Sequence, residues 1–538
     1  MSRHARSRRT VIRPPRPSTA KHLRRRRVLP SLPSLLRSLA GSVGYPRVMV
    51  ALLALVVAVL MILPGAGAGV SGRRQQAGAQ IGSAAVSRPA TTHKPKKARP
   101  TTTLQATTTS VRPTSTTVAA STVTASISAG AAGLTSKPGP SPEITCPAGA
   151  VDIVPGMDIQ AKINANASGT VFCLRAGRHT PATAYLDPSP GDVFIGEYGA
   201  VVDGQHLGKE AFSYRYGPKP VTIKNLTIEN FVSNGIKGGN GWAIEHNEVR
   251  FNGGDGVWFG SVNRNNYVHH NRHGGMVSGF GQSGMVVENN EIAFNNTDSI
   301  RDEPDAGGKM VAVQGVDYHH NWIHDNYGNG IFCDINCYGL NIHHNLVERN
   351  AEVGIKLEIS YDAEIYDNVL HDNGIVDSRC VEAYRCWFTD LGGILVFNSS
   401  NVRVHGNIVE DANGHGIVGR QDDRWRCDTG NVHTGRYCRG DYVVKNLQVY
   451  GNRIQAPTDS RMYQFGDGKW SPFVLAGITG PNDLFENTYN NRFYSNSYRV
   501  PGASGLTGNW FKWIGDTVIT WSRWQSAGLD VDGGISVY

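Results

Sequence analysis

Acidic residues are almost absent from the first quarter of this 538-residue chain. Residues 1–143 contain 22 Lys and Arg but a single acidic residue, Glu143, so this part carries a formal charge of +21. Since the whole chain carries +9, residues 144–538 hold the balance of −12. Phosphate binding needs a basic face, which this body lacks as a whole. We therefore exclude nucleic acid as the main partner of the body.

Charge of either sign is missing from residues 48–72. The stretch begins with an uninterrupted apolar run and is longer than the roughly 20 residues that cross a bilayer. The 13 Lys and Arg of residues 1–47 predict that the amino terminus stays in the cytoplasm. We expect a basic cytoplasmic tail at 1–47, a transmembrane anchor at 48–68 and the rest outside the cell. In the alternative, a signal peptide is cleaved after the small residues 65–68 and the protein is secreted.

Apolar periodicity is missing from residues 69–143, which are mainly Thr, Ser, Ala and Pro with scattered basic residues. Such a segment has no apolar face to bury, so its composition predicts a disordered linker. A flexible chain of this length would hold a folded domain clear of the membrane.

Cysteine is absent before residue 146, and all eight cysteines lie in the part predicted to be outside the cell. An even number on the exported side predicts disulfides. A zinc site at Cys333 and Cys337 is the alternative for one pair, but no second close pair stands at ligand spacing. Pairing neighbours in sequence, one of 105 connectivities, gives Cys146–Cys173, Cys333–Cys337, Cys380–Cys386 and Cys427–Cys438.

The 3.6-residue spacing of helical repeats is also absent, although a unit of about 23 residues recurs along the body. Within a unit, apolar residues alternate at a spacing of two in short runs broken by Asn and Gly, which is typical of strands. Three short strands with tight turns complete one coil. Each unit has a central asparagine, predicted to point inwards and to bond its neighbours in a ladder. We place it at Asn247, Asn271, Asn290, Asn321, Asn345, Asn368, Asn407 and Asn452.

Both ends of such a stack need caps, because an open coil exposes apolar surface and strand edges. Residues 158–163 are predicted to form a short amphipathic segment over the first coil. Residues 501–538 are rich in Trp and are predicted to be a carboxy-terminal cap, with a helix at 521–528. A sugar-stacking platform is the alternative interpretation of the Trp residues.

The repeated segments resemble the right-handed parallel β-helix repeats of the pectate-lyase-like superfamily over residues 150–500. Three elements are similar to those of a group of bacterial β-helix proteins: Gly-Gly-Lys at 307–309, Gly-Ile-Phe-Cys-Asp-Ile at 330–335 and Gly-Ile-Lys-Leu-Glu-Ile-Ser at 354–360. The resemblance implies an all-β domain at 144–500, a right-handed parallel β-helix of 23-residue coils. It leaves the function open, because lyases, hydrolases, epimerases, phage spikes and adhesins share this fold.

Alternation within the repeats predicts one polar patch. It sends Lys356, Glu358 and Ser360 outwards, and one coil earlier it does the same to Asp334 and Asn336. Adjacent coils lie about 4.8 Å apart, so these side chains should be neighbours. We name Asp334, Glu358, Lys356 and Lys309, which lies one further coil back, as candidate catalytic residues. Simple pairing of opposite charges on adjacent strands is the alternative.

Insertions at 297–308, 374–392 and 419–442 interrupt the repeat and would wall this patch as a groove. The histidine pairs 269/270, 319/320 and 343/344 precede turn asparagines, and we expect stacked turn residues rather than metal ligands. The candidate substrate-binding residues are Arg301, Arg379, Arg385, Trp387 and Asn336.

A walled groove of mixed charge with an aromatic residue suits a glycan chain. We expect an exported, membrane-tethered, monomeric protein that acts on cell-surface or extracellular polysaccharide as a lyase, epimerase or glycosidase. A carbohydrate-binding or adhesive protein without turnover is the alternative. Two neighbouring carboxylates should raise one pKa, which suits acid–base chemistry. The acidic face also offers oxygen ligands for Ca²⁺.

Overall fold

The computed structural model describes residues 133–538 except 214–218, 299–306, 375–391, 411, 413, 432, 459–462, 465–469, 472–473, 482–483, 485–486 and 514–516. All described residues fall in one compact unit, Val118–Tyr538. The predicted tail, the predicted anchor and most of the predicted linker lie outside the described residues. In the part that the structure describes, no helix is long and apolar enough to span a membrane.

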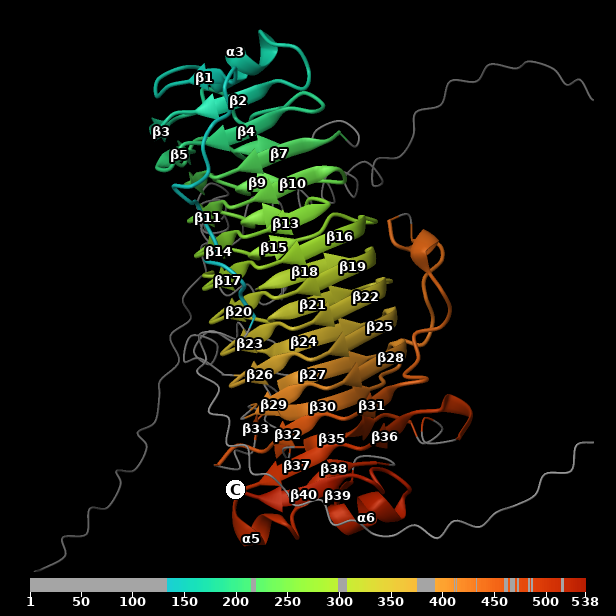
Figure 1. Ribbon diagram of the computed structural model, residues 1–538. Coiled ribbons are helices and arrows are strands. Elements are labelled where there is room, and N and C mark those ends of the chain that lie inside the picture. Colours follow the sequence, from blue (N-terminus) through green and yellow to red (C-terminus); the bar gives the residue numbers. More distant parts are fainter. Residues whose placement is uncertain are drawn as a thin grey trace, which may run out of the picture. The chain divides into compact units, whose positions relative to one another are not determined.

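Three sheets, named A, B and C here, form the faces of the coil stack (Figure 1), and their strands pair in parallel except at the end of sheet C. Sheet A contains β1 (Val151–Ile153), β2 (Val171–Leu174), β4 (Val193–Gly196), β7 (Val221–Lys224), β10 (Trp242–Glu245), β13 (Val262–Arg264), β16 (Ser283–Glu288), β19 (Gln314–His319), β22 (Tyr338–His343), β25 (Tyr361–Tyr366), β28 (Ser400–His405), β31 (Gln448–Tyr450) and β36 (Arg492–Tyr494).

Sheet B contains β3 (Gly177–His179), β5 (Ala200–Asp203), β8 (Thr227–Glu229), β11 (Glu248–Arg250), β14 (Tyr267–His269), β17 (Glu291–Ala293), β20 (Trp322–His324), β23 (Leu346–Glu348), β26 (Val369–His371), β29 (Ile408–Glu410), β32 (Arg453–Gln455), β37 (Ser497–Val500) and β40 (Gly534–Val537).

Sheet C contains β6 (Phe212–Ser213), β9 (Ile236–Lys237), β12 (Val257–Trp258), β15 (Met276–Val277), β18 (Gly308–Val311), β21 (Ile331–Asp334), β24 (Val353–Glu358), β27 (Gly392–Phe397), β30 (His415–Arg420), β35 (Val474–Thr479), β38 (Asn509–Lys512) and β39 (Val518–Thr520). Outside these sheets, β33 (Tyr463–Gln464) and β34 (Trp470–Ser471) pair antiparallel, and η1 (Gly435–Tyr437), η3 (Asn487–Tyr489) and α5 (Gly502–Gly505) are short helical turns.

One coil takes one strand from each sheet, so β21, β22 and β23 are followed by β24, which pairs with β21. The inward residues of these strands, such as Ile331, Cys333 and Leu357, are fully buried in a continuous apolar core. The predicted alternation and parallel β-helix are therefore confirmed for the body.

The predicted asparagine ladder is confirmed, with one correction. Between sheets A and B, the Asn321 Nδ2 donates to Asn345 Oδ1 at 2.9 Å, and Asn345 Nδ2 donates to Asn368 Oδ1 at 2.9 Å. Asn271 belongs instead to a second ladder between sheets B and C, five residues further along its coil, and Asn266 takes its place in the first. Both positions suit an amide that bonds to its neighbours, which is why the repeat alone confuses them.

Caps close both ends as predicted. The helix α3 (Ile159–Asn164) begins at Asp158, whose carboxylate accepts from the Ala161 N–H at 3.1 Å, and it buries Ile159 and Ile163. At the other end, α6 (Trp521–Ser526) buries Trp524, whose ring lies 5.1 Å from that of Phe493. Trp524 is therefore core packing and not a sugar platform.

Residues 133–143, which composition assigns to the linker, lie against the coils. The Gly139 N–H donates to Asn265 O at 2.8 Å, and the Ser141 N–H donates to Asn225 Oδ1 at 2.7 Å. This contact follows from the turn asparagines, whose oxygens along the A–B edge accept hydrogen bonds from the passing segment. The segment appears as a thin cyan coil beside the stack (Figure 1).

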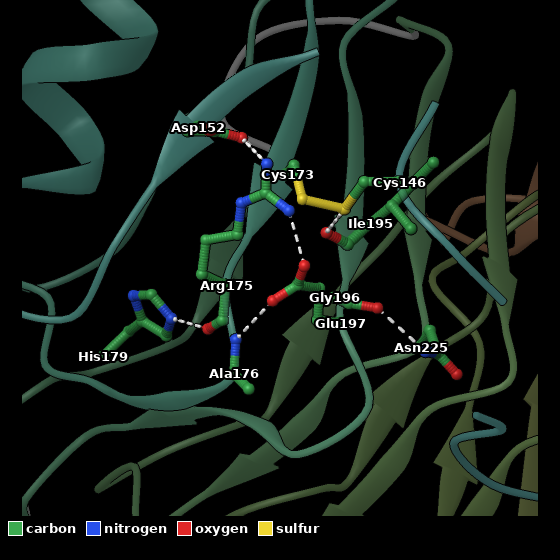
Figure 2. Close-up of a disulfide and its surroundings, with 10 residues drawn as sticks. All are labelled: Cys146, Asp152, Cys173, Arg175, Ala176, His179, Ile195, Gly196, Glu197 and Asn225. Atoms are coloured by element: carbon green, nitrogen blue, oxygen red, sulfur yellow. Dashed lines mark hydrogen bonds and ion pairs between the residues drawn. A yellow bond between two sulfur atoms is a disulfide. The ribbon is translucent and has the colours of Figure 1, made fainter. Parts of the chain in front are cut away.

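Three of the four predicted disulfides are present: Cys146–Cys173, Cys333–Cys337 and Cys427–Cys438. The fourth predicted pair, Cys380–Cys386, lies outside the described residues. Figure 2 shows the first bridge, with the Cys146 sulfur 3.7 Å from Ile195 O. Beside it, Arg175 forms ion pairs with Asp152 and Glu197, so the bridge and this pairing tie three successive strands of sheet A together.

Candidate functional site

The outer face of sheet C brings the four predicted catalytic residues together. In β21 and β24, Asp334 is the direct neighbour of Glu358, and Phe332 is the direct neighbour of Lys356. Lys309 of β18 pairs with Phe332 on the other side. The strands hold these positions because their alternate residues are buried in the core, which leaves the polar side chains outside.

Ion pairs connect the patch. The Lys309 Nζ lies 3.6 Å from Asp334 Oδ2, and the Lys356 Nζ lies 2.8 Å from Glu358 Oε2. The second oxygen of Glu358 is 2.5 Å from Arg424 Nη1. The side chains of Asp334 and Glu358 are only 16% and 10% exposed, so these pairs are partly shielded from solvent.

Asp334 has an unusual acidity. Burial, and after it the neighbouring charge of Glu358, raise the pKa of its carboxyl to about 6. The positive charge of Lys309 opposes this rise. A carboxyl of this pKa exists in both protonation states near neutral pH. It can therefore take up or release a proton under physiological conditions.

Two phenylalanines lie among the charges. The Lys356 Nζ is 4.9 Å from the centre of the Phe332 ring, and the Arg424 guanidinium is 4.6 Å from the centre of the Phe397 ring. Arg420 also lies over Phe397, at 4.8 Å. Such cation–aromatic contacts hold the cations in place over the face.

These aromatic residues and Arg424 were missed from the sequence. The alternation already points Phe332 and Phe397 outwards, so an apolar ring at a solvent position was the available signal for them. No repeat signal marks Arg424, because it lies in an insertion whose path only tertiary structure defines.

Arg424 belongs to residues 421–443, here named the bridging loop. The loop leaves β30 and reaches back several coils, where the His433 ring lies 5.5 Å from that of Phe280. The Arg439 guanidinium lies 3.6 Å over the Tyr338 ring, and the disulfide Cys427–Cys438 closes the loop on itself. One side of the polar patch is therefore bounded by an ordered insertion, as predicted for 419–442.

Asn336 does not reach the groove. It is fully buried, its Nδ2 donates to Thr434 O at 3.0 Å, and its Oδ1 accepts from the Tyr442 hydroxyl at 2.9 Å. We correct its predicted role from substrate contact to holding the bridging loop. Ser360, predicted to face outwards, is also buried and donates to Glu358 O at 2.7 Å.

Asn336 and Ser360 differ from the prediction because each lies just beyond the end of its strand. Ile335, Asn336 and Ile359 have φ of +54°, +63° and +39°, so the chain turns directly after Asp334 and Glu358. Alternation cannot be extended through such a left-handed turn. Arg301, Arg379, Arg385 and Trp387, the other predicted substrate-binding residues, lie outside the described residues.

Two of the three histidine pairs, 319/320 and 343/344, stack on each other from one coil to the next. His319 stacks on His343 at 5.0 Å, and His320 stacks on His344 at 5.2 Å. In the pair 269/270, His269 ends β14 of sheet B and stacks on Tyr267 at 3.9 Å, while His270 lies in the turn that follows and stacks on Phe294 at 5.0 Å. Over the described residues, no group of three or more His, Cys, Asp or Glu is placed to hold a metal ion.

Comparison with known proteins supports the architecture. A family model described as "right handed beta helix region" matches residues 213–370. A search of curated protein sequences finds no match. Together with the three parallel sheets, the family match identifies the body as a right-handed parallel β-helix.

Several solved structures are similar in fold. The A-module of mannuronan C-5 epimerase AlgE4 from Azotobacter vinelandii is 16% identical with a TM-score of 0.43, over 71% of this chain and 92% of that one. A PL6 family polysaccharide lyase from Pseudopedobacter saltans is 11% identical with a TM-score of 0.28, over 72% and 93%. The catalytic domain of a GH87 α-1,3-glucanase is 11% identical with a TM-score of 0.31, over 72% and 71%.

Proposed function

We propose that this protein is a polysaccharide-modifying enzyme whose active site is the outer face of sheet C, with Asp334 as its proton-transferring residue. The observation that carries the proposal is the Asp334 carboxyl, raised in pKa to about 6 beside the paired carboxylate of Glu358. Acid–base catalysis at neutral pH requires a group with a pKa near the working pH, and a carboxyl with a raised pKa among partly shielded charges is such a group.

The ion pairs of Glu358 favour one class of reaction over another. Each of its two oxygens is held by a cation, Lys356 or Arg424, so an ion pair would have to weaken before Glu358 attacked a sugar or activated a water molecule. A glycosidase needs a second carboxylate for one of those tasks. Proton removal by one base, with cations to hold the negative charge that develops, needs only Asp334 and the Lys and Arg residues around it.

A uronic-acid polymer fits such a site. In its ionised form, Asp334 would take the C5 proton next to the sugar carboxylate, and the electron pair left on C5 would be delocalised into that carboxylate. Lys309 and Lys356 would balance the charge. Expulsion of the C4 oxygen then gives a lyase, while return of a proton to the opposite face gives an epimerase. The solved structures with similar folds include both kinds of enzyme and a glucanase, but the preference for proton removal at C5 rests on the ion pairs of Glu358.

Export and a membrane tether are part of the proposal. They are supported by the basic residues 1–47, the uncharged residues 48–72 and the three disulfides of the body, which are typical of an oxidising compartment. The substrate would then be an extracellular or cell-surface polysaccharide.

A screen of uronic-acid polysaccharides with the full-length chain tests the reaction. Ultraviolet absorbance detects the double bond that a lyase forms, proton exchange at C5 in D₂O detects an epimerase, and reducing ends on neutral glucans detect a glycosidase. Asp334→Asn should lower turnover by at least about 100-fold while glycan binding survives. Asp423→Asn, which changes an exposed carboxylate of the bridging loop, should leave turnover unchanged.

Two results would contradict the proposal. Full turnover by Asp334→Asn would place the chemistry elsewhere. Glycan binding by the wild-type chain with no turnover of any polysaccharide would favour the binding or adhesive protein, for which the mutually paired charges of the patch are also suitable.

A further inference from the structure

A second concave site lies at the carboxy-terminal end of the stack. Sheet A ends at β36, and α6 lies at the same end of the stack (Figure 1). Residues 527–532 follow α6 and run beside β36, where the Asp530 N–H donates to Phe493 O at 2.8 Å. Between them is a hollow of about 830 Å³, within the range typical of ligand sites. We name this the cap hollow, and its lining includes Gln448, Arg492, Tyr494, Trp513, Leu529 and Asp532.

The cap hollow is separate from the proposed active site. It opens on sheet A, whereas Asp334 lies on sheet C. Along the stack, β21 and β35 are four strands apart in sheet C, which corresponds to roughly 20 Å. A ligand in the cap hollow therefore cannot touch the acid–base patch with the same sugar unit.

A row of stacked rings leads to this hollow. On successive strands of sheet A, neighbouring rings are nearly parallel with centres 4.7 to 5.2 Å apart, along the row His319, His343, Tyr366, His405, Tyr450 and Tyr494. The last pair, Tyr450 and Tyr494, is stacked at 4.9 Å with only 5° between the ring planes.

Tyr494 is the terminal ring of the row. Because the rings stack along the axis, one face of Tyr494 covers Tyr450 and the other points past the end of sheet A into the cap hollow. The residue keeps 36% of its surface exposed. The row holds the ring in a fixed plane before any ligand arrives, which reduces the entropy lost on binding. A flat, immobile, half-exposed ring is a suitable platform for the C–H face of a sugar.

Polar groups around the platform are fixed by hydrogen bonds. The Arg492 Nε–H donates to Asn490 Oδ1 at 2.7 Å, and the Gln448 Nε2–H donates to Asn490 O at 2.6 Å. The Asp532 carboxylate accepts from the Ser495 N–H at 2.9 Å. A guanidinium has five donors and a carboxylate accepts several bonds, so both groups keep capacity for hydroxyl groups of a ligand.

The charges indicate the class of ligand. Arg492 and Asp532 balance each other, and Asn490 and Gln448 add only neutral amides. This differs from the sheet C patch, where Lys309, Lys356 and Arg424 form ion pairs with Asp334, Glu358 and Asp422. A polyanion gains little from a balanced site, whereas a polyhydroxylated neutral ring uses both donors and acceptors.

We propose that the cap hollow binds a neutral sugar unit stacked on Tyr494, and that it is a second glycan-binding site of this protein. A polysaccharide held there keeps its neighbouring segments near the body, which raises their effective concentration at the sheet C face without any new contact. The proposal does not depend on which reaction occurs at the sheet C face.

Binding of the full-length chain to insoluble cellulose, chitin and xylan, measured by co-sedimentation, tests the proposal. The wild-type chain should bind at least one of them, and Tyr494→Ala should weaken that binding at least about 10-fold. Tyr494→Trp should retain it, because a larger ring preserves the platform. Tyr198→Ala is the matched control, since Tyr198 is a 60% exposed tyrosine near the other end of the stack.

Two further measurements separate this site from the sheet C face. Asp532→Asn should weaken binding, whereas Asp334→Asn should leave it unchanged. Unfolding midpoints close to that of the wild type show that each variant is folded. The proposal is overturned if the wild-type chain binds none of the three polymers, if Tyr494→Ala binds as the wild type does, or if Asp334→Asn abolishes binding.

Discussion

At the scale of single residues, the proposed chemistry depends on Asp334. Its neighbour Glu358 has two cationic partners, while Asp334 has the more distant Lys309 at 3.6 Å and a carboxyl that burial makes reluctant to ionise. The same β-helix geometry places both carboxylates, yet their partners give them different tasks. In the proposed reaction, proton transfer falls to Asp334, and Glu358 supplies fixed charge that orients Lys356 and Arg424.

The raised pKa of Asp334 predicts that the variant with lower turnover, Asp334→Asn, is more stable than the wild type at alkaline pH. The folded state binds this proton more tightly than the unfolded state, so the stability it brings is present below about pH 4 and is lost as the pH rises through 6. Asp334→Asn should therefore be more stable than the wild type at pH 8, by up to about 3 kcal/mol, with no gain near pH 4. Denaturant unfolding at both pH values measures this.

The matched control for that measurement is Asp423→Asn, whose carboxylate is exposed and should show no such pH-dependent gain. A stability gain for Asp334→Asn that is equal at pH 4 and pH 8 would show that packing, and not the ionisation of Asp334, is responsible.

At the scale of elements, the bridging loop converts a flat sheet face into a bounded site. It brings Arg424 to Glu358, and it is held at Asn336 by hydrogen bonds and at Tyr361, whose hydroxyl donates to Gly440 O at 2.8 Å. The disulfide Cys427–Cys438 constrains the loop without contributing to the coil core. Loop order and coil stability should therefore be separable.

Replacing Cys427 and Cys438 together by Ser tests this separation. The loop closed by the bridge is small, so its loss should cost no more than about 2–3 kcal/mol. We expect the coil stack to unfold cooperatively at a slightly lower midpoint, the bridging loop to become sensitive to protease, and turnover to fall because Arg424 is no longer held. Circular dichroism, limited proteolysis and the polysaccharide assay measure the three effects. Loss of the whole folded domain at ambient temperature would show that the loop is part of the core.

At the scale of the whole molecule, the chain separates its charges. The first 143 residues carry +21 and the remaining residues carry −12. Within the body, repetition supplies a long stack, and two of its three faces carry the proposed sites: sheet C carries the acid–base patch, and sheet A carries the aromatic row that ends at the cap hollow. The stack separates the two proposed glycan sites by several coils while keeping both on one rigid support.

The charge separation predicts the orientation of the chain in a membrane. Protease added to intact cells should remove the folded body and leave a small basic fragment in the membrane fraction, because residues 1–47 would be cytoplasmic. Immunoblots with antibodies against the tail and against the body measure this. A body found in the culture medium with its first residue near position 70 would instead support a cleaved signal peptide.

The sequence by itself determined the coil period, the inward and outward sides of the strands, seven of the eight ladder asparagines, both caps and three disulfide pairs in the described part of the chain. These are properties of local repetition: alternation fixes which side chains are buried, and one coil predicts the next. For the same reason, alternation predicted that Lys309, Asp334, Lys356 and Glu358 lie together on one outer face. Only the tertiary structure decided where alternation stops, because a turn at Ile335 or Ile359 leaves no mark in the repeat.

The contacts made by insertions and by the ends of the body could not be predicted, for a related reason. Arg424 reaches Glu358 across 66 residues, and the segment at 133–143 reaches turn asparagines more than 80 residues away. The cap hollow combines the last strand of sheet A with residues after α6. Such contacts join segments that do not repeat, so no period relates them, and their positions depend on how the whole stack is packed.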